Sequence, residues 1–324
     1  MPLIAVTDSV FPNLEPARKV LAEIGGELHL AAQPTQEAIL DVAREADGVL
    51  TTYAKMPAGL IEQLGRCRII ARFGIGVDNV DIPAATRRGI VVTRVPDYCL
   101  DEVSDHAMAL LLALARKIPS SNARTHAGRW EMKAVAPIHR LRGTVLGLVA
   151  FGQIPRLVAP KARAFGMRVV ACDPFVSNEA MARAGVERVE FAELVAISDY
   201  ISIHTPLVAE TRRLFNADVF RRMKPGAYLI NTARGPVIDE AALAQALDEK
   251  RIAGAALDVM EQEPPANSPL FGRDNVILTP HTSFYSEESL VDLQTKAAQE
   301  VLRALTGQPV RNPVNPEVKR SAAG

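Results

Sequence analysis

The sequence predicts an α/β protein made of two doubly wound domains, each with a parallel sheet covered by helices. Short apolar runs rich in β-branched residues alternate with amphipathic helical stretches along nearly the whole chain. The runs are apolar at consecutive positions, which is typical of parallel strands that helices cover on both faces. The length of 324 residues corresponds to two domains of ordinary size.

The expected elements follow from this alternation. The predicted strands are Leu3–Thr7, Gly48–Tyr53, Arg68–Phe73, Ile90–Val95, Val145–Ala150, Arg168–Cys172, Tyr200–His204, Ala227–Thr232, Ala253–Val259 and Val276–Thr279. The predicted helices between them include Leu14–Ile24, Thr35–Ala46, Ile154–Phe165, Ala217–Met223 and Asp239–Glu249.

One long helical segment, Asp101–Lys117, interrupts the alternation. It contains neither Pro nor Gly, and we expect Pro119 to end it. Because it separates two groups of strand–helix units, we interpret it as an arm that joins two domains. After His281 the pattern indicates only a helix over about 287–305 and a Pro-rich tail. We therefore expect one domain over residues 1–98 plus 286–324 and another over 99–285.

Composition and charge exclude several classes of protein. Hydrophobic residues make up 48% and charged residues 23%, a balance typical of globular proteins, and the net charge is zero. No basic block indicates a nucleic-acid partner. The longest apolar stretch, Ala107–Ala115, is too short to cross a membrane, and the N-terminus does not resemble a signal peptide. Cys67, Cys99 and Cys172 lack redox or metal-ligand spacing, so we expect no metal and a cytoplasmic location.

A strand–turn–helix pattern at Leu141–Pro155 is a candidate dinucleotide-binding turn. The glycine positions of a G-x-G-x-x-G pattern are occupied by Ala150, Gly152 and Pro155. Asp173 follows Gly152 at a spacing that suits hydrogen bonds to the adenosine ribose, and its charge favours NAD over NADP. With one glycine of three kept, this turn by itself fits an ordinary strand–turn–helix equally well.

Five ordered segments carry a more specific signal. They are Ile230–Asp239, Ala256–Pro264, Leu278–His281, Phe73–Asp81 and Ile203–Leu207. Together they resemble the D-isomer-specific 2-hydroxyacid dehydrogenase family, over almost the whole chain. The resemblance implies a flavodoxin-like substrate domain, a Rossmann NAD-binding domain and an active site in the cleft between them. It also implies NAD as cofactor, a last helix that completes the first domain, and a homodimer supported by the Asp101–Lys117 arm.

The chemistry of three residues agrees with this resemblance. Reduction of a 2-oxo acid builds negative charge on the carbonyl oxygen, so a proton must be delivered there, and histidine suits that task near neutral pH. His281 follows a predicted strand, Glu263 would stabilise its protonated form, and Arg234 would bind the substrate carboxylate in a forked arrangement. Alone, each could be an ordinary structural or surface residue. Glu261 is a second acid nearby, but the family pattern places the catalytic acid directly before Pro264, so we choose Glu263.

The resemblance also implies the residues that bind substrate and cofactor. The backbone of Gly74, Ile75 and Gly76 would hold the substrate carboxylate, although a tight turn explains both glycines as well. The remaining implied contacts are with NAD: Gly152, Gln153, Ile154, Asp173, Thr205, Pro206, Thr232, Ala233, Asp258 and Val103, with Asp258 near the nicotinamide carboxamide. Of the other histidines, His106 is expected to be structural.

The substrate stays open at this stage. Phosphoglycerate dehydrogenases usually carry an Arg after the third strand, whereas the corresponding stretch here, Thr51–Met56, offers only Lys55. Formate dehydrogenase shares the fold but has Gln at the position of Glu263. A corepressor or scaffold that senses NADH is the alternative from another class. The intact set of Arg234, Glu263 and His281 favours an enzyme.

Overall fold

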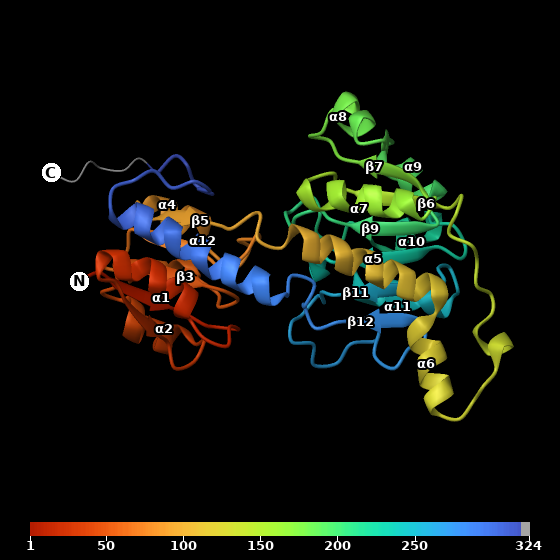
Figure 1. Ribbon diagram of the computed structural model, residues 1–324, viewed down its shortest axis with the longest axis horizontal. Helices are drawn as coiled ribbons and strands as arrows, with labels where there is room; N and C mark the ends of the chain where they lie inside the picture. Colours follow the sequence, from red (N-terminus) through yellow and green to blue (C-terminus); the bar gives the residue numbers. More distant parts are fainter. Residues whose placement is uncertain (319–324) are drawn as a thin grey trace. The chain divides into compact units, whose positions relative to one another are not determined.

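The computed structural model describes residues 1–318, which form two compact units. The first comprises Met1–Tyr98 and the C-terminal segment that begins at Ser286, and the second comprises Cys99–Tyr285. Each unit contains one wholly parallel sheet (Figure 1). The prediction of two doubly wound α/β domains is confirmed.

The first unit has a five-stranded sheet in the order β2-β1-β3-β4-β5. This is the flavodoxin-like order, in which the first connection runs one way from β1 and the later connections run the other way. The strands are β1 (Leu3–Val6), β2 (Glu27–Leu30), β3 (Gly48–Thr51), β4 (Ile69–Arg72) and β5 (Val91–Thr93). The helices are α1 (Glu15–Leu21), followed by a 3-10 turn, α2 (Gln36–Ala43), α3 (Ala58–Ile61), α4 (Ile82–Arg87) and α12 (Glu287–Leu305).

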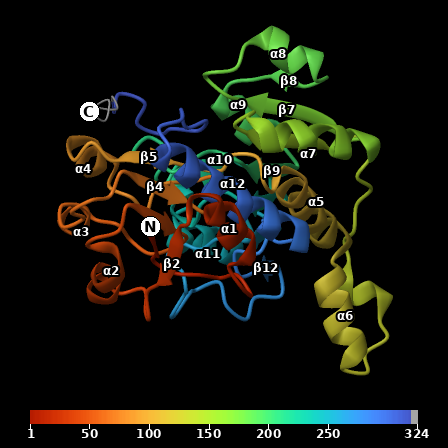
Figure 2. The same cartoon turned by 60° about the vertical axis from the view of Figure 1, so that its left-hand side comes forward.

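The helix α12 returns to the first unit from the far end of the sequence. It packs against α1 and against the strands β3 and β4 (Figure 2). Its start is defined by a capping box, in which Ser286 and Ser289 accept each other's backbone N–H groups. The C-terminal helix is therefore part of the core of the first unit.

The second unit has a seven-stranded sheet in the order β12-β11-β10-β9-β6-β7-β8. The order reverses between β6 and β9, as in a Rossmann fold, and such a switch point is where these sheets bind ligands. The strands are β6 (Val145–Val149), β7 (Arg168–Cys172), β8 (Glu187–Arg188), β9 (Tyr200–Ile203), β10 (Tyr228–Asn231), β11 (Gly254–Leu257) and β12 (Val276–Leu278). The helices are α5 (Leu100–Arg116), α6 (Ile118–His126), α7 (Gln153–Ala164), α8 (Asn178–Arg183), α9 (Phe191–Ile197), α10 (Ala217–Arg222) and α11 (Glu240–Asp248).

Helices cover both faces of this sheet. Leu146 and Leu148 of β6 belong to the apolar cluster under α5 and α7, whereas Val145 and Val149 belong to the cluster under α9, α10 and α11. Successive strand residues point to opposite faces, so a strand buried on both sides must be apolar at every position. This explains why the predicted runs were uninterrupted.

The segment after α5 differs from the prediction. The helix α5 ends at Arg116, and Lys117 takes a left-handed conformation with φ 51°. Pro119 then lies in the first turn of a new helix, α6, instead of ending helical structure. Proline suits that position because first-turn N–H groups have no partner within the helix. In both views α6 projects from the end of α5, away from the sheet (Figures 1 and 2).

No helix within residues 1–318 is both long enough and apolar enough to span a membrane.

Candidate active site

The predicted catalytic residues all follow neighbouring strands of the second unit. In the parallel sheet, Asn231 of β10 is in register with Leu257 of β11, which is in register with Leu278 of β12. Arg234 and His281 lie three residues beyond the ends of β10 and β12. The carboxyl ends of parallel strands share one edge of the sheet, so the topology delivers both side chains to that edge.

Glu263 and His281 are in direct contact. The Glu263 Oε2 atom lies 2.6 Å from Nδ1 of His281, and Oε1 accepts a hydrogen bond of 2.9 Å from the backbone N–H of Met260. A carboxylate only accepts, so Nδ1 carries a proton and donates to Glu263. The other ring nitrogen, Nε2, is then the atom that can exchange a proton with a substrate. The exposed fractions of the two side chains are 22% for His281 and 34% for Glu263, which leaves the pair partly accessible.

The neighbouring acid, Glu261, has a different partner. Its carboxylate lies 2.9 Å from the guanidinium of Arg213, which also lies 3.7 Å from Asp239. Between the two acids, it is Glu263 that the local fold directs to His281.

Arg234 lies on a loop that packs tightly against the segment leading to Glu263. The side chain of Asn231 donates 2.9 Å to the carbonyl oxygen of Arg234 and accepts 2.9 Å from the N–H of Ala233. A Cβ atom on Gly235 would lie 1.9 Å from the carbonyl carbon and oxygen of Met260. Only glycine permits this approach, so the loop that carries Arg234 is held beside Met260, three residues before Glu263.

The turn between β6 and α7 has the geometry of an anion site. Gly152 is the N-cap of α7, a helix of 12 residues, and Gln153 and Ile154 begin its first turn. Backbone N–H groups at such a terminus attract phosphate. A Cβ built on Gly152 meets nothing within 4 Å, so the space above the turn is open to a bound group. These residues fit the pyrophosphate of a dinucleotide.

The two altered glycine positions behave differently in this turn. Ala150 has a φ of 78°, a left-handed conformation in which glycine carries no steric penalty. Pro155 is buried in the first turn of α7, where its missing N–H costs no helical bond. Of the two replacements, only Ala150 therefore strains the turn, because its side chain disfavours this backbone conformation.

Asp173 supports the turn through both of its carboxylate oxygens. Its Oδ2 atom accepts 2.8 Å from the N–H of Phe151, and Oδ1 accepts 2.8 Å from the N–H of Phe175. The residue is 8% exposed. Each carboxylate oxygen has a further lone pair, so the side chain can hold the turn and still accept from a ribose hydroxyl.

The other predicted cofactor residues lie along the same edge of the second unit or beside it. Thr205 and Pro206 follow β9, Thr232 and Ala233 follow β10, and Asp258 directly follows β11. Val103 is a buried residue of α5, a helix that packs against α7, β10 and β11.

Next to Thr205, His204 is partly buried and its Nε2 atom lies 2.9 Å from the hydroxyl of Ser202. Burial lowers the pKa of His204 to about 4, because desolvation disfavours the charged ring. The ring is therefore neutral over the whole physiological range, which suits a structural residue better than a proton donor.

In the first unit, Gly74, Ile75 and Gly76 follow β4 as predicted. Gly74 has a φ of 146°, and a Cβ atom there would lie 1.2 Å from a guanidinium nitrogen of Arg72. Arg72 is 7% exposed, and its guanidinium carbon lies 6.0 Å from the centre of the Tyr53 ring. Sequence reasoning did not single out Arg72, although a cation at the end of an apolar strand is a usable signal.

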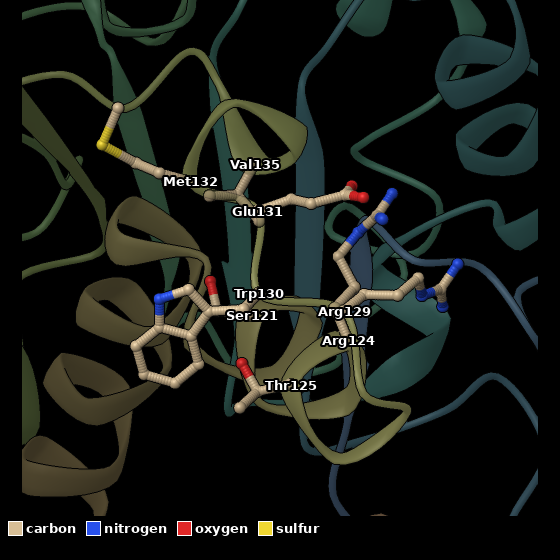
Figure 3. A pocket seen from close by; sticks show the side chains of 8 residues that line it. All are labelled: Ser121, Arg124, Thr125, Arg129, Trp130, Glu131, Met132 and Val135. Atoms are coloured by element: carbon tan, nitrogen blue, oxygen red, sulfur yellow. The ribbon is translucent and has the colours of Figure 1, made fainter.

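A hollow elsewhere in the second unit contains none of the predicted catalytic residues. It has a volume of about 250 Å³ and is formed by α6 and the segment after it (Figure 3). Within residues 1–318, no group of three or more His, Cys, Asp or Glu side chains is arranged to hold a metal ion.

The comparisons with known proteins give one consistent result. The family model described as "D-isomer specific 2-hydroxyacid dehydrogenase, NAD binding domain" matches residues 108–283. A D-3-phosphoglycerate dehydrogenase of Methanocaldococcus jannaschii is 39% identical over 324 residues, which is 99% of this chain and 61% of that protein. A glyoxylate reductase of Thermococcus litoralis is 38% identical over 296 residues, 89% of each protein.

Solved structures give the same result. The chain superposes on a D-lactate dehydrogenase of Aquifex aeolicus, solved in complex with NAD and lactic acid, with a TM-score of 0.89 and 26% identity. That match covers 98% of this chain and 100% of the other. By contrast, the chain spans only 50 to 61% of the length of the first three curated phosphoglycerate dehydrogenases it matches.

Proposed function

Because the chain belongs to the D-isomer-specific 2-hydroxyacid dehydrogenase family, we propose that it is an oxidoreductase that uses NAD(H) and acts at C2 of a small D-2-hydroxy acid or its 2-oxo acid. The observation that carries this proposal is the pair formed by His281 and Glu263, 2.6 Å apart. A scaffold that only senses NADH has no need of a histidine held in this way. The first unit is proposed as the substrate domain and the second as the NAD-binding domain.

The residues divide the work of reduction between them. NADH, when bound, would supply a hydride for the C2 carbonyl carbon. His281 gives its Nε2 proton to the carbonyl oxygen, which becomes the hydroxyl of the product, and Glu263 stabilises the imidazolium before transfer. Arg234 binds the substrate carboxylate, with the backbone of Gly74, Ile75 and Gly76 as the other carboxylate-binding element. Oxidation of the hydroxy acid reverses each step.

The cofactor site is proposed along the carboxyl edge of the seven-stranded sheet. The pyrophosphate would bind at Gly152, Gln153 and Ile154, which the open space above the Gly152 turn supports. The adenosine would lie against Asp173, Thr205 and Pro206. The nicotinamide would lie against four residues: Val103, Thr232, Ala233 and Asp258.

A substrate panel tests the proposal. Glyoxylate, hydroxypyruvate, pyruvate and 3-phosphohydroxypyruvate are each incubated with the full chain and NADH or NADPH, and the loss of absorbance at the reduced nicotinamide band is followed. At least one acid should turn over, and His281→Ala should lower kcat by about 10²-fold or more with NADH affinity unchanged. The enzyme proposal fails if no acid in the panel turns over while NADH binds.

Phosphoglycerate oxidation is the second candidate. The 39% identity to the M. jannaschii phosphoglycerate dehydrogenase favours it. Against it stands the segment Thr51–Met56, where Lys55 is the only cation. If phosphohydroxypyruvate is the true substrate, its kcat/KM should exceed that of hydroxypyruvate, and Lys55→Met should remove that difference.

We propose a homodimer through α6 and the segment after it, and not through the expected arm Asp101–Lys117, because α5 has eight residues buried within the second unit. Among the described residues, no side chain of α6 is buried, and a short helix without a buried face is marginal in water. Trp130 and Met132 next to it are 89% and 83% exposed. Light scattering should give the mass of a dimer for the wild type and of a monomer for Trp130→Glu. Phe175→Glu is the control, since Phe175 is 95% exposed in a different part of the same unit.

A cytoplasmic location is also proposed, with no nucleic-acid or membrane partner. Its support is that no disulfide joins Cys67, Cys99 and Cys172, as expected in a reducing compartment. Fractionation of cells that produce the protein, with a cytoplasmic marker enzyme as reference, tests it.

A further inference from the structure

The backbone at His281 is in an unusual conformation. His281 has a φ of 53°, in the left-handed region that residues with a side chain avoid. Such a conformation persists only where the surrounding structure holds it. The direction of the imidazole ring therefore depends on whatever fixes the backbone here.

One buried residue receives the N–H groups of this segment. The N–H of His281 donates 2.8 Å to the backbone oxygen of Asp258. The next two N–H groups donate to its carboxylate: that of Thr282 to Oδ1 at 2.9 Å, and that of Ser283 to Oδ2 at 2.9 Å. Three consecutive donors thus converge on a residue that is 1% exposed. We call this arrangement of Asp258 with residues 281–283 the aspartate clamp.

The carboxylate of the clamp is itself oriented from the opposite side. The hydroxyl of Thr279 donates to Asp258 Oδ1 at 2.5 Å. A threonine hydroxyl has one proton, so its oxygen must accept from His106, whose Nε2 atom lies 3.1 Å away. His106 belongs to α5 and lies 3.7 Å from the same carboxylate oxygen. A chain of contacts therefore runs from α5 through Thr279 and Asp258 to the backbone of His281.

We propose that Asp258 is a positioning residue for His281, and that Thr279 and His106 orient its carboxylate. Asp258 acts through the backbone N–H groups of residues 281–283 and not by contact with the reacting atoms. Both carboxylate oxygens are occupied by donors of the chain itself, which a role limited to the cofactor would not require. The proposal rests on the proposed function, because it assumes that His281 is the proton donor.

The first test replaces one acceptor with a donor. In Asp258→Asn, the amide nitrogen faces an N–H group and breaks one bond of the clamp. We expect kcat for 2-oxo acid reduction to fall about 10²-fold, because a small displacement of a catalytic group has an effect of that size. The Kd for NADH, from fluorescence titration, should rise less than about tenfold, because Asp258 also borders the proposed nicotinamide site, and the substrate KM should change less than about threefold. If the Kd for NADH rises by more than kcat falls, Asp258 acts mainly through the cofactor, and the positioning role is wrong.

A second test asks whether Asp258 acts through His281. Residues that act as a unit are not additive, so Asp258→Asn should lower the rate little further in a His281→Ala background. A full additional 10²-fold loss there would overturn the proposal. The control on the proposed function is His281→Ala alone. If that variant keeps full activity, the assignment of the proton donor has failed, whereas the positioning role fails separately if His281→Ala is inactive and Asp258→Asn is not impaired.

A third test avoids any change to the buried carboxylate. Thr279→Val removes the hydroxyl and keeps the shape, whereas Thr279→Ser restores the hydroxyl. We expect kcat of the Val variant to fall about tenfold and that of the Ser variant to recover most of it. With NADH deuterated at the transferred position, the isotope effect on kcat should increase in the Val variant as hydride transfer becomes slower. Equal kcat values for Val and Ser would show that the hydroxyl does not orient Asp258.

Discussion

Replacement of Glu263 by Gln tests the central contact of the site. The amide has nearly the shape of the carboxylate, and its oxygen can still accept from the N–H of Met260. With the amide oxygen on Met260, the amide NH2 group faces Nδ1 of His281, so the variant loses both the negative charge and the acceptor 2.6 Å from that nitrogen. A hydrogen bond to a charged group contributes about 1.5–3 kcal/mol. If that stabilisation is present in the protonated ring and lost in the variant, kcat/KM for reduction should fall about 10- to 150-fold.

The assay compares two glutamates that lie two residues apart. Initial rates of 2-oxo acid reduction are measured for the wild type, Glu263→Gln and Glu261→Gln, together with NADH affinity. Glu261→Gln removes an exposed ion pair with Arg213 and should change kcat/KM less than about twofold. Neither variant should change the Kd for NADH. The reasoning is refuted if Glu263→Gln keeps wild-type activity, or if Glu261→Gln loses as much.

Four further variants test the surrounding structure. Gly235→Ala places a methyl group 1.9 Å from the Met260 carbonyl, so we expect a loss of about 1–3 kcal/mol in urea unfolding together with lower kcat; wild-type values for both would show that the loop can shift. Gly152→Ala meets no protein atom within 4 Å, so its stability should match the wild type while the Kd for NADH rises about tenfold; an unchanged Kd would remove the pyrophosphate from this turn. Asp173→Ala should narrow the preference for NADH over NADPH, measured as a ratio of kcat/KM values, and an unchanged ratio would show that the ribose contact is misassigned. The pKa of His204, lowered to about 4, lies below its unfolded value, so protonation of the unfolded chain destabilises the protein as the pH falls below about 6.5. From pH 7 to pH 5, the free energy of unfolding should decrease by about 1–2 kcal/mol less in His204→Gln than in the wild type. Equal decreases in the two proteins would contradict the lowered pKa of His204.

The sequence predicted the central strands well because burial on both faces leaves an unbroken apolar run. Val145–Val149 and Arg168–Cys172 are in this class. Two of the four edge strands, β2 and β8, were missed because they lack such a run. Glu27–Leu30 has one buried residue, and Glu187–Arg188 has both side chains exposed, so neither carries an apolar run.

The helices follow the same rule. The helix Glu287–Leu305 was predicted with the bounds that the structure has, because its buried residues recur at helical spacing after a serine N-cap. The helix Ile118–His126 has no buried residue and has Pro119 in its first turn, so its sequence carries no clear amphipathic pattern. A helix without a buried face has no periodic pattern of apolar residues from which it could be predicted.

For the candidate site, the sequence supplied residue types and the fold supplied their partners. The resemblance selected Glu263 over Glu261, and the structure separates the two acids by their contacts with His281 and Arg213. No local pattern could have linked His106 to Thr279, because 173 residues separate them. Such contacts depend on the order of strands in the sheet, which the sequence pattern does not contain.

Buried polar side chains at the ends of strands share one role in the second unit. Asp173 directly follows β7 and accepts from the N–H of Phe151. Asn231 ends β10 and holds the loop of Arg234, and Asp258 follows β11 and holds the backbone after His281. A polar group buried at the end of an apolar strand is costly unless its hydrogen bonds are made. Backbone groups of the turns that carry the proposed functional residues satisfy these side chains: N–H groups in all three cases, and for Asn231 also the carbonyl oxygen of Arg234. A polar residue that closes an apolar strand therefore marks, in the sequence alone, where a sheet of this kind fixes its functional loops.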